Sequence, residues 1–149
     1  MGRLVAQDNN TLKPDTRERP ETSLKILVAE EDPGVRQFCC TALQRLGYET
    51  CEASNVANCI RLLETTNEPV KLVLLDINMR DYAPFETILE IRRRQPTAVV
   101  VAMVSFDRPG LRWALQKGYL KQLLVKPFSW EDLRSVTGRY LGKPSSPDL

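Results

Sequence analysis

Residues 70–76, VKLVLLD, decide the fold of this chain. The four consecutive apolar residues at positions 72–75 predict a strand covered on both faces, because a strand with one wet face would alternate apolar and polar side chains. The stretch ends on Asp76, and an ionised carboxylate is seldom buried without a partner. The sequence therefore predicts an interior strand with an acidic group at its carboxyl end, whose charge some other group must compensate.

Apolar stretches of the same kind recur along the chain and alternate with segments of helical spacing. Strands are expected at residues 24–29, 48–53, 70–76, 98–105 and 122–126. The helices after them are bounded by residues that favour helix ends, namely Gly47, Ser54 or Asn55, Pro84, Gly118 and Ser129. Five strand–helix units of this kind predict a doubly wound α/β fold, with one parallel sheet between two layers of helices.

The third helix illustrates the packing that the pattern predicts. Pro84 suits its first turn, and Phe85, Ile88 and Leu89 are expected to point toward the sheet.

The polar segments at the two ends set the expected domain limits. Residues 1–23 lack periodicity and are expected to form a flexible arm, and residues 142–149 a short flexible tail. The domain itself is expected at residues 24–141.

The composition excludes several classes of protein. A net charge of +2, from 21 basic and 19 acidic residues, gives no reason to expect a nucleic-acid or membrane surface. No apolar run approaches the roughly 20 residues of a membrane span. The chain has no histidine, which excludes Ser-His-Asp and Cys-His catalysis as well as histidine zinc sites. The four cysteines show no metal or disulfide spacing, and we interpret them as small core residues in a reducing cytoplasm.

Polar residues follow several of the predicted strands. The first strand ends in Glu30, Glu31 and Asp32, the third in Asp76, the fourth in Ser105 and the fifth in Lys126. Each residue alone has an ordinary structural explanation, such as a helix cap, a turn residue or a solvated lysine. Ligands of open parallel sheets bind at the carboxyl ends of the strands, however, and here all these groups meet at that edge.

This combination resembles the receiver domains of bacterial response regulators, of the CheY type. The matching motifs are ILVAEEDP at 26–33, LLDINM at 74–79, VAMVSF at 101–106 and LLVKPF at 123–128. The resemblance covers residues 24 to about 141 and implies the sheet order 2-1-3-4-5. It also implies a cis peptide bond between Lys126 and Pro127.

The resemblance assigns a role to each of the conspicuous residues. Asp76 would accept the phosphoryl group, while Ser105 and Lys126 would bind its oxygens. Mg²⁺ would be held by Glu30, Glu31, Asp76 and the backbone carbonyl of Asn78. The carboxylate of Asp76 would then be neutralised by the metal and the lysine together, which answers the question that its position raises.

The implied function is that of a cytoplasmic single-domain response regulator. It would take its phosphoryl group from a histidine kinase or a phosphotransfer protein and lose it by slow autodephosphorylation. It would signal through protein contacts, on the face formed by the fourth helix, fifth strand and fifth helix, without binding nucleic acid or entering a membrane. It would be a switch and not an enzyme acting on other substrates.

Four departures from the family pattern leave an alternative open. The acidic pair is Glu-Glu, Arg80 stands where proline is usual, and Phe106 replaces a small residue beside the serine. Leu123 replaces an aromatic residue that often switches inward on activation. The glutamate pair and Phe106 favour a pseudo-receiver, an interaction module that signals without phosphorylation.

Two other functions fit the sequence less well. An aspartate-dependent phosphohydrolase would need a second aspartate at position 78, which is asparagine. A flavin-binding protein of similar fold would need a loop rich in Ser, Thr or Gly after the first strand, where this chain has acidic residues.

Overall fold

The computed structural model describes residues 24–142. The predicted flexible arm, and all of the predicted tail except Gly142, lie outside these residues.

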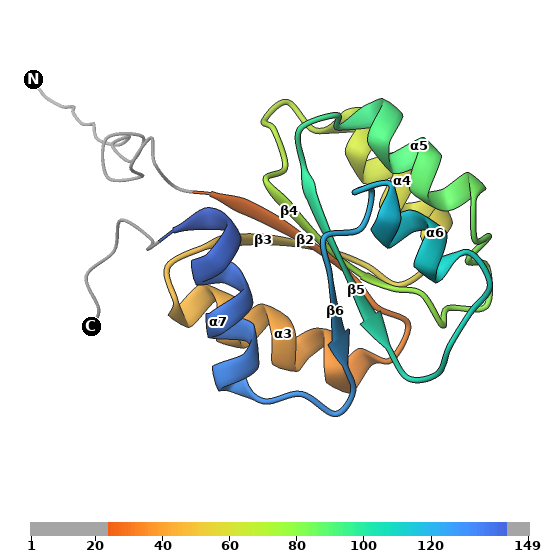
Figure 1. The fold of residues 1–149 in the computed structure, drawn as a ribbon. Coiled ribbons are helices and arrows are strands. Elements are labelled where there is room, and N and C mark those ends of the chain that lie inside the picture. The colour runs from red at the N-terminus through yellow and green to blue at the C-terminus, as the bar shows by residue number, and fades with distance from the viewer. Residues whose placement is uncertain (1–23, 143–149) are drawn as a thin grey trace, which may run out of the picture.

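A five-stranded parallel sheet forms the centre of the molecule (Figure 1). Its order is β3-β2-β4-β5-β6, which is the predicted order 2-1-3-4-5. The strands are β2 (Lys25–Ala29), β3 (Glu49–Ala53), β4 (Leu72–Asp76), β5 (Val99–Val104) and β6 (Gln122–Val125). Every residue of β4 is buried, as the apolar run at 72–75 predicted.

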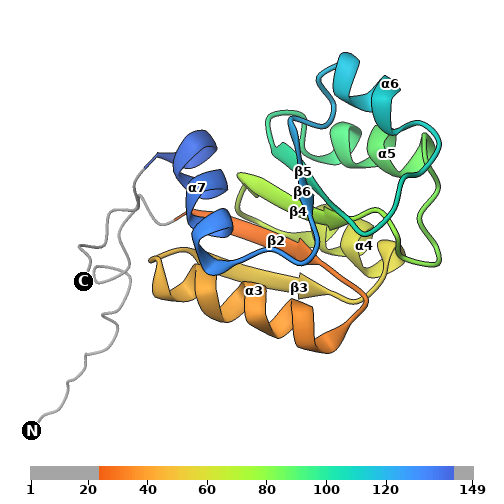
Figure 2. The same ribbon diagram turned by 60° about the horizontal axis from the view of Figure 1, so that its bottom comes forward.

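Five helices cover the two faces of the sheet (Figure 2). They are α3 (Pro33–Arg45), α4 (Val56–Thr65), α5 (Glu86–Arg94), α6 (Leu111–Gln116) and α7 (Trp130–Leu141). Helices α3 and α7 pack on the face that receives Leu72 and Leu74 of β4, and the other three helices pack on the face that receives Val73 and Leu75. Two separate apolar clusters therefore share one sheet, which is the physical reason that the strands are apolar throughout.

Several predicted helix boundaries are confirmed. Asn55, one of the two residues predicted to cap the second helix, accepts a hydrogen bond from the Asn58 N–H at the start of α4. Ser129 and Asp132 form a capping box at the start of α7. Gly47, after α3, has a φ of 101°, a left-handed conformation that glycine adopts without strain. The predicted cis peptide bond between Lys126 and Pro127 is also present.

The predicted packing of the third helix was partly wrong. Helix α5 begins at Glu86, and Pro84 precedes it. The side chains of Phe85 and Leu89 are 45% and 47% exposed, whereas Ile88 is buried as predicted. The buried face consists of Thr87, Ile88 and Ile91. The buried stripe is thus displaced by about one residue from the predicted one, with Thr87 and Ile91 buried in place of Phe85 and Leu89.

Phe38 of α3 is likewise 41% exposed and contacts Phe128, with ring centroids 6.4 Å apart, although its spacing suggested the apolar face of the helix. Within residues 24–142, no helix is long and apolar enough to cross a membrane.

Candidate functional site

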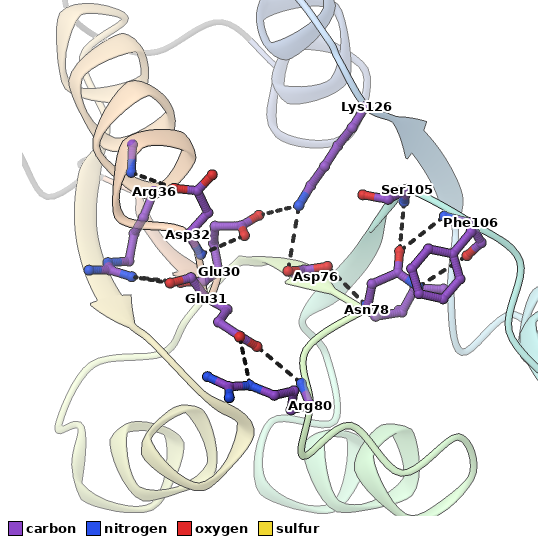
Figure 3. A network of polar contacts seen from close by, with 12 residues as sticks. Glu30, Glu31, Asp32, Arg36, Asp76, Asn78, Arg80, Ser105, Phe106 and Lys126 are labelled. Atoms are coloured by element: carbon purple, nitrogen blue, oxygen red, sulfur yellow. Dashed lines mark hydrogen bonds and ion pairs between the residues drawn. The ribbon is translucent and has the colours of Figure 1, made fainter.

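The carboxyl ends of β2, β4 and β6 bring two carboxylates and an amine together (Figure 3). Glu30 and Asp76 are almost fully buried, with 1% and 3% of their surface exposed. Lys126 Nζ lies 2.7 Å from Glu30 Oε1 and 3.5 Å from Asp76 Oδ2. Lys126 is therefore a direct electrostatic partner of the carboxylate that ends β4.

Backbone pairing fixes the positions of these side chains. The Glu30 N–H donates to the Ala53 carbonyl at 2.9 Å, and the Lys126 N–H donates to the Val104 carbonyl at 2.9 Å. The parallel ladders thus continue one residue beyond the strands that precede Glu30 and Lys126. Their side chains are consequently placed by the sheet and not by a mobile loop.

Burial and charge act in opposite directions on this pair. Burial raises the pKa of the Glu30 carboxyl above its usual value, and the opposing effect of Lys126 does not cancel it. Burial alone would lower the pKa of Lys126, but Glu30 and Asp76 outweigh it and raise that pKa. The lysine therefore remains an ammonium at neutral pH, while the site still has more negative than positive charge.

Glu31, the second residue of the acidic pair, points away from this cluster (Figure 3). Its Oε2 lies 2.9 Å from Arg80 Nε, and its Oε1 accepts a hydrogen bond of 3.1 Å from the Arg80 backbone N–H. Arg36 donates to the backbone carbonyls of Glu30 at 2.7 Å and Glu31 at 3.3 Å. The sequence did not predict these contacts, although it places an arginine at position 80 where the family usually has proline.

Asn78 connects the loop after β4 to the loop after β5. Its Oδ1 accepts hydrogen bonds from the backbone N–H groups of Ser105 at 2.6 Å and Phe106 at 3.2 Å. Its Nδ2 donates to the Phe106 carbonyl at 3.1 Å, and its own N–H donates to Asp76 Oδ1 at 2.9 Å. The sequence gave a role to the carbonyl of Asn78 alone, so this use of the side chain was missed.

A cleft of about 440 Å³ opens beside the cluster. Ser105 and Lys126 line it on one side, and the remaining lining residues are Gly34, Val35, Phe38, Pro127 and Phe128. The serine is exposed, so its hydroxyl is available to a group that enters the cleft. The cleft therefore gives a small anion a path to the polar groups at the ends of the strands.

The donor atoms match the chemistry of Mg²⁺, which prefers hard oxygen ligands. Glu30 and Asp76 share the Lys126 ammonium, so one cation compensates two carboxylates. Glu31, however, is paired with Arg80, and residues 24–142 contain no group of three acidic, cysteine or histidine side chains that could hold a metal ion. Two of the three predicted carboxylate ligands thus lie together, and the third faces a guanidinium.

Comparisons with known proteins identify the family. The model of the response regulator receiver domain matches residues 26–137. The chain is 30% identical over 125 residues to the DNA-binding transcriptional regulator NtrC of a Bradyrhizobium species, covering 80% of this chain and 24% of that protein. It is 28% identical over 109 residues to the response regulator receiver protein CpdR of Brucella abortus, covering 73% of this chain and 89% of that protein. It thus spans about a quarter of the length of the NtrC relatives that it matches.

Solved structures agree in fold. The receiver domain of a sensor histidine kinase from Pseudomonas aeruginosa, with a magnesium ion coordinated in its active site cleft, superposes with a TM-score of 0.67 at 21% identity. That comparison covers 80% of this chain and 98% of the Pseudomonas receiver-domain chain. The sheet order, the residues at the strand ends and the match over residues 26–137 lead to one conclusion: this chain belongs to the response regulator receiver domain family of two-component signalling.

Proposed function

We propose that this chain is a phosphorylatable switch in which Asp76 accepts a phosphoryl group from a histidine kinase or a phosphotransfer protein. The observation that supports this most directly is the position of the Asp76 carboxylate, at the edge of the sheet and 3.5 Å from the Lys126 ammonium. A carboxylate beside a fixed cation can attack an anionic phosphoryl group, because the cation offsets the repulsion between the two negative charges.

The transfer follows from the groups in the site. An oxygen of Asp76 attacks phosphorus, the bond from phosphorus to the donor's imidazole nitrogen breaks, and the electron pair stays on that nitrogen. Lys126 binds a phosphoryl oxygen of the resulting acyl phosphate, and the Ser105 hydroxyl donates a hydrogen bond to another. Glu30, Glu31, Asp76 and the Asn78 carbonyl would hold Mg²⁺, which would supply positive charge to the transferred group.

We further propose that the chain acts as a single-domain regulator in the cytoplasm. The similarity to CpdR supports this, because the match covers most of that protein's length. The four cysteines are all free thiols, which suits a reducing compartment. A downstream protein would bind the face formed by α6, β6 and α7. There the edge strand β6 exposes 62% of Val125, and an unpaired strand edge favours contact with another chain.

Phosphoryl uptake tests the proposal directly. The full chain, incubated with acetyl phosphate and Mg²⁺, is expected to gain the mass of one phosphoryl group in intact-mass spectrometry. Asp76→Asn preserves the volume but removes the nucleophile, so it should gain none while unfolding at a similar temperature. Equal labelling of the parent and of Asp76→Asn would place the acceptor elsewhere.

The alternative is a pseudo-receiver, and the pairing of Glu31 with Arg80 favours it, since this contact draws one carboxylate away from the predicted metal ligands. A folded parent that gains no phosphoryl mass at saturating donor and Mg²⁺ would support the alternative.

A further inference from the structure

Arg80 contacts Glu31 through both its side chain and its backbone. The Nε atom lies 2.9 Å from Glu31 Oε2, and the backbone N–H donates to Glu31 Oε1 at 3.1 Å. Both carboxylate oxygens are thus bound by one residue from the loop that follows Asp76. Within this pairing, the Glu31 carboxylate is directed toward Arg80 and away from Glu30 and Asp76 (Figure 3).

Neighbouring contacts hold both partners of this pair in place. The Arg36 guanidinium binds the backbone carbonyl of Glu31 at 3.3 Å. On the other side, the Asp81 carboxylate accepts hydrogen bonds from the N–H groups of Val56 at 2.9 Å and Ala57 at 3.2 Å, at the start of α4. Anchoring residue 81 to a helix N-terminus fixes the backbone of the adjacent Arg80. The ion pair therefore loses less conformational entropy on forming than two unrestrained surface side chains would.

The Arg80–Glu31 ion pair changes the balance of charge at the carboxyl edge of the sheet. Glu30, Glu31 and Asp76 contribute three negative charges, and Lys126 contributes one positive charge. The Arg80 guanidinium neutralises a further charge at the carboxylate that lies nearest solvent. It thereby supplies part of the positive charge that a divalent cation would otherwise provide.

We infer that Arg80 competes with the divalent cation for Glu31 and so sets the Mg²⁺ affinity of the site. The cation gains its third carboxylate only when Glu31 leaves Arg80, and the free energy of the Arg80–Glu31 contact is subtracted from that of cation binding. Arg80 is in this sense a positioning residue, because it acts on the metal through Glu31. The inference deepens the proposed function, since it concerns the cation that phosphoryl uptake requires.

The solvent exposure of Arg80 limits how much its ion pair can change the Mg²⁺ affinity. The Arg80 side chain is 90% exposed, and exposed ion pairs contribute up to about 1 kcal/mol to stability. Removing the guanidinium should therefore lower the dissociation constant for Mg²⁺ between about twofold and fivefold, which corresponds to about 0.4–1 kcal/mol. The difference should shrink as ionic strength rises, because salt screens exposed charges.

The test is a calorimetric titration of the full, unphosphorylated chain with Mg²⁺, in the absence of any phosphodonor. Arg80→Ala and Arg80→Gln should each bind Mg²⁺ between about twofold and fivefold more tightly than the parent. Arg93→Ala is the matched control, because Arg93 forms an exposed ion pair with Glu90 at 2.9 Å on α5. It removes the same charge without touching Glu31 and should bind Mg²⁺ as the parent does. A circular dichroism melt verifies that each variant is folded.

A double-variant cycle separates the contact from a general charge effect. Glu31→Gln should weaken Mg²⁺ binding, and adding Arg80→Ala to it should then change the affinity by less than twofold. The inference is overturned if Arg80→Ala binds no more tightly than Arg93→Ala, if its gain persists beside Glu31→Gln, or if the Arg80 variants and the parent all fail to bind Mg²⁺. Because no phosphodonor is present, failure of phosphoryl uptake would leave this result unaffected.

Discussion

The side chain of Asn78 is the polar group that joins two loops of the site. Its amide accepts from two backbone N–H groups and donates to one backbone carbonyl in the loop after β5. The same residue follows Asp76 closely enough for its N–H to bind the Asp76 carboxylate. Hydrogen bonds therefore connect the Asp76 carboxylate to the backbone of Ser105 through Asn78.

Replacing this amide should loosen the loop after β5. Asn78→Ala removes three hydrogen bonds and should lower the free energy of unfolding by about 1–2 kcal/mol. The amide protons of Ser105 and Phe106 should also exchange faster with solvent. Urea unfolding and hydrogen exchange measure the two effects.

Ser105→Ala is the control for Asn78→Ala, because the bonds from Asn78 end on the backbone of Ser105 and Phe106 and not on the hydroxyl. It should leave the exchange of both amide protons unchanged. Equal exchange rates in the parent and in Asn78→Ala would contradict the role of the amide.

The sequence predicts some of these residues better than others, for a physical reason. The edge at which Glu30, Asp76 and Lys126 meet was predictable, because parallel strands bring their carboxyl ends together whatever the loops do. The partner of Glu31 was not, because it depends on the path of the loop that presents Arg80. The side-chain contacts of Asn78 likewise depend on two loops at once.

At the scale of single elements, helix α5 shows that an apolar residue in a helix is not always buried. Leu89 is apolar and lies in a helix, yet it is 47% exposed, because the helix turns Thr87, Ile88 and Ile91 to the sheet. Spacing alone did not decide between these faces, since Leu89 and Ile91 both lie on a helical stripe that includes Ile88.

Two leucine substitutions measure this difference. Leu74→Ala removes a fully buried side chain from β4 and should lower the free energy of unfolding by about 2–5 kcal/mol. Leu89→Ala removes the same atoms from an exposed position and should change it by less than about 0.5 kcal/mol. Chemical denaturation compares them, and similar losses for both variants would contradict the described orientation of α5.

Burial of the thiols provides a pH-dependent measure of helix packing. Burial raises the pKa of Cys39 in α3 and of Cys59 in α4 to about 12, and that of Cys40 to about 11. Only the thiolate reacts with iodoacetamide, so at about pH 8 these residues should label far more slowly in the native protein than in urea. Their labelling rates should keep rising with pH beyond about 9, where an ordinary cysteine levels off.

Peptide mapping by mass spectrometry identifies the labelled thiols. Cys51 in β3 is only partly buried and should be the first to react in the native state. Rapid native labelling of Cys39 or Cys59 would show that α3 or α4 is packed less firmly on the sheet than described.

At the scale of the whole molecule, the fold was the most predictable feature. The uninterrupted apolar strands require helices on both faces, and the two apolar clusters on either side of β4 meet that requirement. Local signals such as Gly47 and the Ser129 capping box agree with this global arrangement. The exposure of single side chains such as Phe38 and Phe85 was less predictable. An aromatic residue at the edge of a helix's apolar face can point either toward the core or toward solvent.

The two ends of the described domain lie close together, away from the site. The Leu24 carbonyl accepts a hydrogen bond from the Glu49 N–H, and the Gly142 carbonyl accepts one from the hydroxyl of the adjacent Tyr48. Both ends therefore meet at the start of β3, at the amino edge of the sheet, opposite the strand ends that hold Asp76. A sensor chip or fluorescent reporter tethered through either end would leave the cleft facing open solution, so partner binding can be measured on the immobilised protein without masking its phosphoacceptor.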